Sequence, residues 1–268
     1  MPVEHLLDPW IWLVIAALAA GAVNSLAGGG TLLTFPTLLA ALAGLGPDEA
    51  AVVANMTSTV ALVPGSLAGA WGYRREMGAV RPWLLLLAAP SLAGGLVGAL
   101  LVTRLDPSYF AFLVPWLTLL AALLFLAQPL LVPRPESAHP FHRRGHAHQV
   151  AAIFFQLLVA VYGGYFGAGI GIVMLGAFSV MGLWDVHQMN ALKTILAVLI
   201  NGISVIVFIV DGRVAWPYAL VMALSAIVGG YLAARSARYL PRWLVRWTVI
   251  AAGLIVSAYL FWRRATAS

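Results

Sequence analysis

Two glycine clusters interrupt apolar stretches of the sequence. The first occupies residues 24–31, with the order Asn-Ser-Leu-Ala-Gly-Gly-Gly-Thr, and the second runs from Gly163 to Gly171. Adjacent glycines disfavour helix, so we expect the backbone to open at both places and a new helix to follow. The N-terminus of a helix that faces a protein-lined cavity attracts anions. The clusters therefore predict two anion-directed helix N-termini, with close helix packing through small residues as the alternative.

Lys193 is the single ionisable residue deep inside an apolar run, about one helical turn after Met189. A charge in hydrocarbon costs at least about 2.5–3.5 kcal/mol, so we expect this lysine to face a cavity and balance an anion. The alternative is that its stem reaches the lipid headgroups. All nine Asp and Glu residues lie at segment ends or in loops. The sequence thus lacks the buried carboxylates that cation pumps and metal transporters place in their spans, which disfavours a cation pathway and leaves one lined only by neutral oxygens as the alternative.

Amide and hydroxyl side chains near the glycines and the lysine complete the predicted anion site. The candidate residues are Asn24, Ser25, Gly28, Gly29, Gly30, Thr31, Asn55, Ser58, Thr59, Gly169, Gly171, Asn190, Lys193, Thr194 and Asn201. The same polar groups can also hydrogen-bond between helices. A Ser58–Lys193 pair would allow an intramembrane enzyme, but no catalytic or cofactor motif accompanies it, so we predict neither enzymatic activity nor a cofactor.

The composition requires a membrane environment for these residues. Hydrophobic residues make up 62% of the 268-residue chain and charged residues 9%, whereas an average soluble domain has about 25% charged residues. This balance excludes a soluble enzyme, a nucleic-acid-binding domain and a disordered chain. Fourteen of the fifteen cations are arginines, grouped between the apolar runs as they are beside membrane spans.

Apolar runs long enough to cross a bilayer predict an all-α integral membrane protein with about eight full spans. The expected spans are Trp10–Ala27, Val52–Tyr73, Trp83–Val102, Tyr109–Val132, Val150–Phe166, Met189–Val210, Trp216–Ala234 and Trp243–Trp262. Two shorter runs, Leu32–Leu45 and Ile170–Leu183, follow the glycine clusters and predict half-helices. Asp48 and Asp185 each precede an apolar helix, where we expect them to be N-caps.

The two halves of the chain resemble each other. LAGGGTLLTFPTLLA aligns with FGAGIGIVMLGAFSV, and ANMTSTVALVPG aligns with MNALKTILAVLING. We therefore expect an N-terminal repeat at 1–132, a linker rich in His, Arg and Pro at 133–149, and a C-terminal repeat at 150–268. Each repeat has five segments, and if all five cross the membrane the second repeat starts on the opposite side from the first. The second repeat is then inverted relative to the first. In that topology ten arginines gather on one face and four on the other, with both termini outside.

The linker contains His139, His142, His146 and His148. A solvated loop is the expected structure, and a divalent-metal or other cation transporter that uses this loop is the alternative function. A third possibility is a scaffold that transports nothing.

The run from Asn24 to Leu45, followed by ANMTSTVALVPGSLAGAWGYRRE, resembles the first repeat of the sulfite exporter TauE/SafE family, also called the toluene-sulfonate uptake permeases. GGYFGAGIGIVML followed by MNALKTILAVLINGIS resembles its second repeat. The resemblance implies a multi-pass protein of the bacterial inner membrane. It also implies secondary transport of sulfite, sulfonates or sulfoacetate by alternating access, with a proton or sodium ion as candidate coupling ions. A small anion and the lipid bilayer are then the expected partners, nucleic acid is not, and a homodimer is an expected assembly.

Overall fold

The computed structural model describes residues 9–26, 29–131, 146–181, 183, 185–236 and 242–267, and these residues form helices without strands. The helices are α1 (Pro9–Leu26), α2 (Thr31–Ala41), α3 (Pro47–Gly72), α4 (Met77–Arg104), α5 (Pro107–Leu131), α6 (His146–Tyr165), α7 (Ile170–Val180), α8 (Val186–Asp211), α9 (Trp216–Ser236) and α10 (Arg242–Ala267), with a 3-10 turn, η1, at Ala43–Leu45. The all-helical prediction is confirmed for this part of the chain.

The two short helices lie directly after the glycine clusters. α2 begins at Thr31 and α7 at Ile170, and each has 11 residues. Eleven residues span about 16 Å, about half of a hydrocarbon core. Before α7 the backbone turns sharply because Gly167 and Gly169 have φ angles of +80° and +79°, a region that glycine enters without steric cost. The interruptions of the helix at the glycine clusters thus set where both short helices start.

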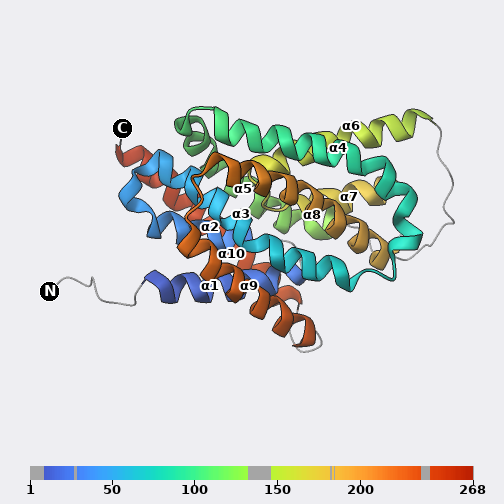
Figure 1. Cartoon of the computed structure of the whole chain (residues 1–268), viewed down its shortest axis with the longest axis horizontal. Helices are drawn as coiled ribbons and strands as arrows, with labels where there is room; N and C mark the ends of the chain where they lie inside the picture. The colour runs from blue at the N-terminus through green and yellow to red at the C-terminus, as the bar shows by residue number, and fades with distance from the viewer. Residues whose placement is uncertain are drawn as a thin grey trace.

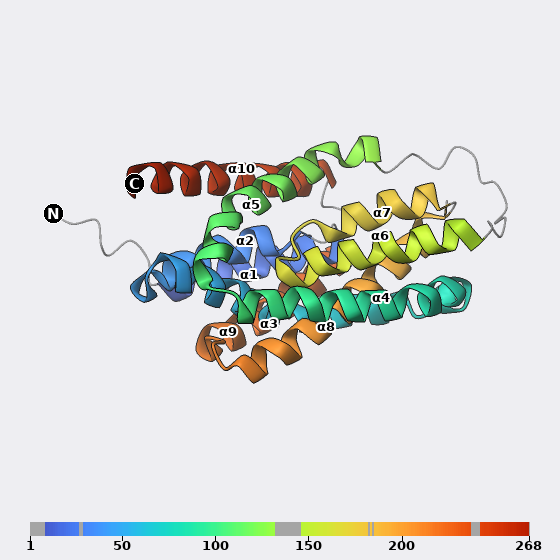
Figure 2. The same ribbon diagram turned by 90° about the horizontal axis from the view of Figure 1, so that it is seen from above.

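The helices run side by side, and the described chain begins and ends at the same end of the bundle (Figures 1 and 2). We call this the arginine-poor end. The α8–α9 connection and the start of α3 lie at the arginine-poor end as well (Figure 2). They are joined there by Arg213 of the connection, whose Nη1 lies 3.5 Å from Glu49 Oε1. The opposite, arginine-rich end carries Arg74, Arg75 and Arg81 around the α3–α4 connection.

Each short helix turns back beside the helix that precedes it. Leu39 near the end of α2 shares a pocket with Pro47 and Arg263 at the arginine-poor end, where α1 also begins. His148 in the first turn of α6 and Met181 just after α7 line another pocket, at the other end. The α1–α2 and α6–α7 hairpins therefore enter the bundle from opposite ends (Figure 2).

Glycines permit the closest helix contacts, in which α1 packs on α9 and α4 on α6. A Cβ at Gly229 would lie 2.0 Å from the carbonyl oxygen of Leu18, and one at Gly98 would lie 2.2 Å from that of Val161. Real Cβ atoms do not approach this closely, so these backbones can touch only where the side chain is absent. The two contacts hold both hairpins against the rest of the bundle.

Length and composition identify six of the expected spans among the described residues, namely α3, α4, α5, α6, α8 and α10, while α1 and α9 fall among the shorter apolar helices. The described carboxylates lie at helix ends or in connections, as expected. Asp185 caps α8 by accepting from the backbone N–H of His187 and Gln188. The prediction for Asp48 is wrong: Gly46 is the N-cap residue of α3, and Asp48 lies in the first turn. There its negative charge stabilises the helix by interacting with the positive end of the helix dipole.

Candidate anion-binding site

A small cavity of about 70 Å³ lies where the tips of the two hairpins meet α3 and α8. Its lining residues are Asn24, Thr31, Thr59, Leu62, Gly65, Ser66, Gly69, Tyr73, Phe166, Gly167, Ile170, Gly171, Lys193, Thr194, Ala197 and Asn201. A cavity needs about 10–15 Å³ by this measure to hold one water molecule. The space therefore suits several waters or one small oxyanion.

Lys193 supplies the charge of this cavity. Its side chain is 8% exposed, and its Nζ donates to Asn190 Oδ1 at 3.0 Å. A Cβ at Gly171 would lie 3.0 Å from Lys193 Cδ, so the glycine makes room for the lysine stem. Among the described residues both ion pairs involve Arg213, and no carboxylate lines the cavity. A buried cation without a carboxylate partner favours an anionic ligand.

The first residues of both short helices line the same cavity, with Thr31 from α2 and Ile170 and Gly171 from α7. The partial positive charges of two helix N-termini therefore point at the space that contains the lysine. Asn24 Nδ2 donates to Ser66 Oγ at 2.8 Å and so joins the end of α1 to α3. Such hydroxyl and amide groups can donate to oxyanion oxygens.

Seven of the predicted site residues line the cavity, namely Asn24, Thr31, Thr59, Gly171, Lys193, Thr194 and Asn201. Asn190 reaches it through its hydrogen bond to Lys193. Gly169 is the N-cap residue of α7. Gly28 and the side chain of Ser25 lie outside the described residues.

The other predicted residues make contacts between or within helices. Asn55 Nδ2 donates to the carbonyl oxygen of Tyr165 at 3.0 Å, and the Ser58 hydroxyl lies 2.6 Å from that of Thr34. Ser58 therefore does not form the hydrogen bond to Lys193 that an enzyme would use, because Lys193 Nζ donates to Asn190 instead. A Cβ at Gly29 would meet the ring of Phe125, and one at Gly30 the carbonyl oxygen of Ala20, so these two glycines serve close packing.

The sequence reasoning missed lining residues along α3, chiefly Ser66, Gly69 and Tyr73. They continue the face that begins at Thr59 with steps of three or four residues, which is the spacing of one helical face. Extending the polar patch along this period would have found them. Phe166 and Gly167 of the second break were likewise not predicted.

Half of the predicted histidine cluster falls outside the described part of the chain. His139 and His142 lie there, while His146 and His148 lie in the first turn of α6. The described residues contain no group of three or more His, Asp or Glu side chains that could hold a metal ion.

A family model described as sulfite exporter TauE/SafE matches residues 13–260. The chain belongs to the sulfite exporter TauE/SafE family. Similar TauE/SafE relatives include the probable membrane transporter protein YfcA of Escherichia coli strain K12, 27% identical over 93% of this chain and 88% of the relative. A probable membrane transporter protein of Haemophilus influenzae is 25% identical over 92% of both chains. The probable membrane transporter protein ORF9 of Sinorhizobium sp is 28% identical over 84% of this chain and 82% of the relative.

Membership of the TauE/SafE family, together with the six long apolar helices found among the described residues, makes this chain a multi-pass protein of a membrane transporter family. The resemblance seen in the glycine clusters is thereby confirmed. A transporter moves a small solute and requires no covalent chemistry, which agrees with a cavity whose polar groups suit binding.

Proposed function

We propose that the protein is a secondary transporter of small sulfur-containing oxyanions, of the sulfite, sulfonate and sulfoacetate class. The observation that carries the proposal is the convergence of Lys193 and two helix N-termini on one cavity without a lining carboxylate. Sulfite and sulfonate groups offer several charged oxygens to such donors. The small volume favours compact anions over bulky aromatic sulfonates, and the family description supports sulfur chemistry.

We propose further that the chain consists of two inverted repeats, at 1–132 and 150–268, joined by the linker at 133–149. The packing supports this because three helix contacts have a counterpart when the halves are exchanged: α1 on α9 with α6 on α4, α3 on α9 with α8 on α4, and α2 on α10 with α7 on α5. Gly94 approaches the carbonyl oxygen of Leu157 as Gly229 approaches that of Leu18. Inverted repeats around a central site are a common architecture for alternating access.

In this proposal the structure represents the state open toward the arginine-rich end. The lining of the cavity extends along α3 to Tyr73, which is the C-cap of α3 at that end. Toward the other end, Phe166 packs against Phe35 and Phe110 at ring distances of 5.6 and 6.3 Å. Closer to the arginine-poor end than these aromatic rings, Arg213 links α3 to the α8–α9 connection through its ion pairs with Glu49 and Asp211. Its hydrogen bond to Asp211 raises the pKa of the guanidinium. The positive-inside rule places the arginine-rich end in the cytoplasm.

A single introduced cysteine tests this access pathway, because the chain has none of its own. Ala197 lines the cavity, and Ala43 is exposed at the arginine-poor end. We expect a membrane-impermeant methanethiosulfonate reagent to modify Ala197→Cys faster from the arginine-rich side and Ala43→Cys from the opposite side. Sealed vesicles of known orientation provide the measurement. Faster modification of Ala197→Cys from the arginine-poor side would contradict the proposed state.

Uptake into proteoliposomes tests the function itself. We expect accumulation of labelled sulfite or sulfoacetate that unlabelled sulfonates inhibit, and no accumulation of nickel or zinc. Removing residues 135–148 should leave anion uptake intact, since the described residues that line the cavity all lie outside this range. Metal uptake that is lost in the linker deletion would instead establish the alternative cation transporter.

A further inference from the structure

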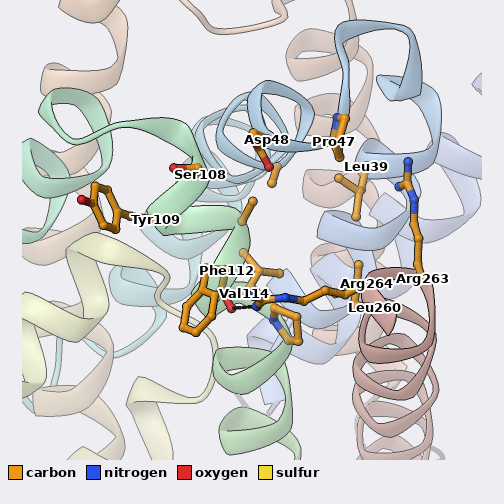
Figure 3. Close-up of a pocket in the computed structure, with 13 residues that line it drawn as sticks. Leu39, Pro47, Asp48, Ser108, Tyr109, Phe112, Val114, Leu260, Arg263 and Arg264 are labelled. Carbon is orange, nitrogen blue, oxygen red and sulfur yellow. Dashed lines mark hydrogen bonds between the residues drawn. The ribbon is translucent and has the colours of Figure 1, made fainter. Parts of the chain in front are cut away.

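A second pocket lies at the arginine-poor end and shares no lining residue with the anion cavity. Its volume is about 700 Å³, within the range of about 300–1,000 Å³ typical of small-molecule sites. It lies between the start of α5, the last turns of α10 and the junction of α2 with α3 (Figure 3). α5 changes direction part-way along in Figure 2, because Pro115 inside it disrupts regular helix. The bend leaves this space between the helices.

The pocket has apolar walls and a charged mouth. Leu39, Val114 and Leu260 contribute to the walls, and the charged lining residues are Arg263, Arg264 and Asp48, whose part of the pocket we call the mouth. Figure 3 shows Arg264 extending from α10 across the pocket to α5. Its guanidinium carbon lies 3.9 Å from the centroid of the Phe112 ring, and its Nη1 donates to the carbonyl oxygen of Phe112 at 3.3 Å. These contacts fix one positive charge at the mouth.

Arg263 and Asp48 carry charges of opposite sign at the mouth, but they form no ion pair with each other. Arg263 is half-buried and Asp48 is exposed, and neither takes part in the ion pairs of the described residues, both of which involve Arg213. A ligand that satisfies both needs an anionic group for Arg263 and a cationic group for the Asp48 carboxylate. Because helices begin and end here, the mouth lies at the level of the lipid headgroups, with the walls beneath it at the level of the acyl chains.

We propose that this pocket binds a phospholipid whose headgroup carries a phosphate and a primary ammonium, of the phosphatidylethanolamine class. The phosphate contacts Arg263 and Arg264, since the arginine fork suits phosphate oxygens. The ammonium contacts Asp48, and an acyl chain covers the apolar walls. The lipid thereby links α10 to α3 and α5 outside the anion pathway, and this assignment does not depend on which substrate is transported.

Native mass spectrometry of the delipidated full-length protein tests the proposal. We expect dioleoylphosphatidylethanolamine to bind about tenfold more tightly than dioleoylphosphatidylglycerol, because the second lipid lacks the ammonium group. Asp48→Asn should remove this preference while leaving phosphatidylglycerol binding unchanged, and Arg263→Gln should weaken both lipids. Soluble phosphoethanolamine should not compete at millimolar concentration, because it lacks the acyl chains.

Arg104→Gln is the matched control, because Arg104 is exposed at the same end but lies outside the pocket. Ala111→Trp fills the pocket without changing its charge, and should prevent lipid binding while anion uptake persists. Equal binding of the two lipids to the unmodified protein would overturn the proposal. So would a preference for phosphatidylethanolamine that survives Asp48→Asn, or unchanged lipid binding in either Arg263→Gln or Ala111→Trp.

Discussion

Lys193→Met is expected to reduce the kcat/KM of anion uptake by roughly 10- to 150-fold. The variant keeps most of the apolar stem but removes the ammonium group that lies 3.0 Å from Asn190 Oδ1 in the cavity. A hydrogen bond to a charged group contributes about 1.5–3 kcal/mol, and 1.4 kcal/mol corresponds to about a factor of ten. Initial uptake rates in proteoliposomes, measured over a range of substrate concentrations, provide the value.

Two further variants separate charge from packing. Asn190→Asp has nearly the same shape and would place a carboxylate beside Lys193 Nζ, so we expect it to impair anion uptake although the lysine remains. Arg81→Gln removes a cation of the exposed surface near the α3–α4 connection and should leave uptake unchanged. Normal uptake by a correctly folded Lys193→Met protein would exclude the lysine from substrate binding.

Gly98→Val is expected to lower the apparent melting temperature by roughly 2–12 °C. Its Cβ would lie 2.2 Å from the carbonyl oxygen of Val161 and 2.6 Å from the amide nitrogen of Tyr165. Backbone atoms cannot rotate away, so α4 and α6 must separate. Overpacking costs about 1–3 kcal/mol, and each kcal/mol shifts the transition by about 2–4 °C in a protein of about this size. Thermal unfolding in detergent measures the change.

Gly202→Ala is the matched control for this destabilisation. Gly202 also lies inside a long helix, α8, but an added Cβ would meet no atom within 4 Å. Since alanine favours helix by up to about 1 kcal/mol relative to glycine, we expect a small stabilisation. Gly229→Val should be as damaging as Gly98→Val, because it faces the carbonyl oxygen of Leu18. A melting temperature of Gly98→Val equal to that of the unmodified protein would contradict the close α4–α6 packing.

The sequence alone predicted the features that depend on local backbone chemistry. Consecutive glycines disfavour helix wherever the chain goes, so the short helices after them were predictable, and α2 and α7 begin where the clusters end. The expected run to Leu45 was too long, because α2 ends at Ala41 and a 3-10 turn follows. An isolated lysine in an apolar run has to face a polar space, and Lys193 lines the cavity.

The division of the polar residues between binding and packing was not predictable. Asn55 and Thr59 are neighbours on α3, yet Asn55 donates to the carbonyl oxygen of Tyr165 while Thr59 lines the cavity. The difference arises from how the tip of the α6–α7 hairpin docks against α3. That docking is a tertiary contact between residues about 110 positions apart, which helical periodicity does not encode.

Substrate protection of a cavity cysteine tests the central claim most directly. The alkylation rate of Ala197→Cys by N-ethylmaleimide is measured in detergent with increasing concentrations of sulfoacetate and methanesulfonate, with Ala43→Cys as the control. If these anions bind beside Lys193, they will slow alkylation of Ala197→Cys in a saturable manner, leave Ala43→Cys unaffected, and lose their effect in the Lys193→Met background. An alkylation rate of Ala197→Cys that stays constant across all anion concentrations would contradict the account of this cavity as the anion site.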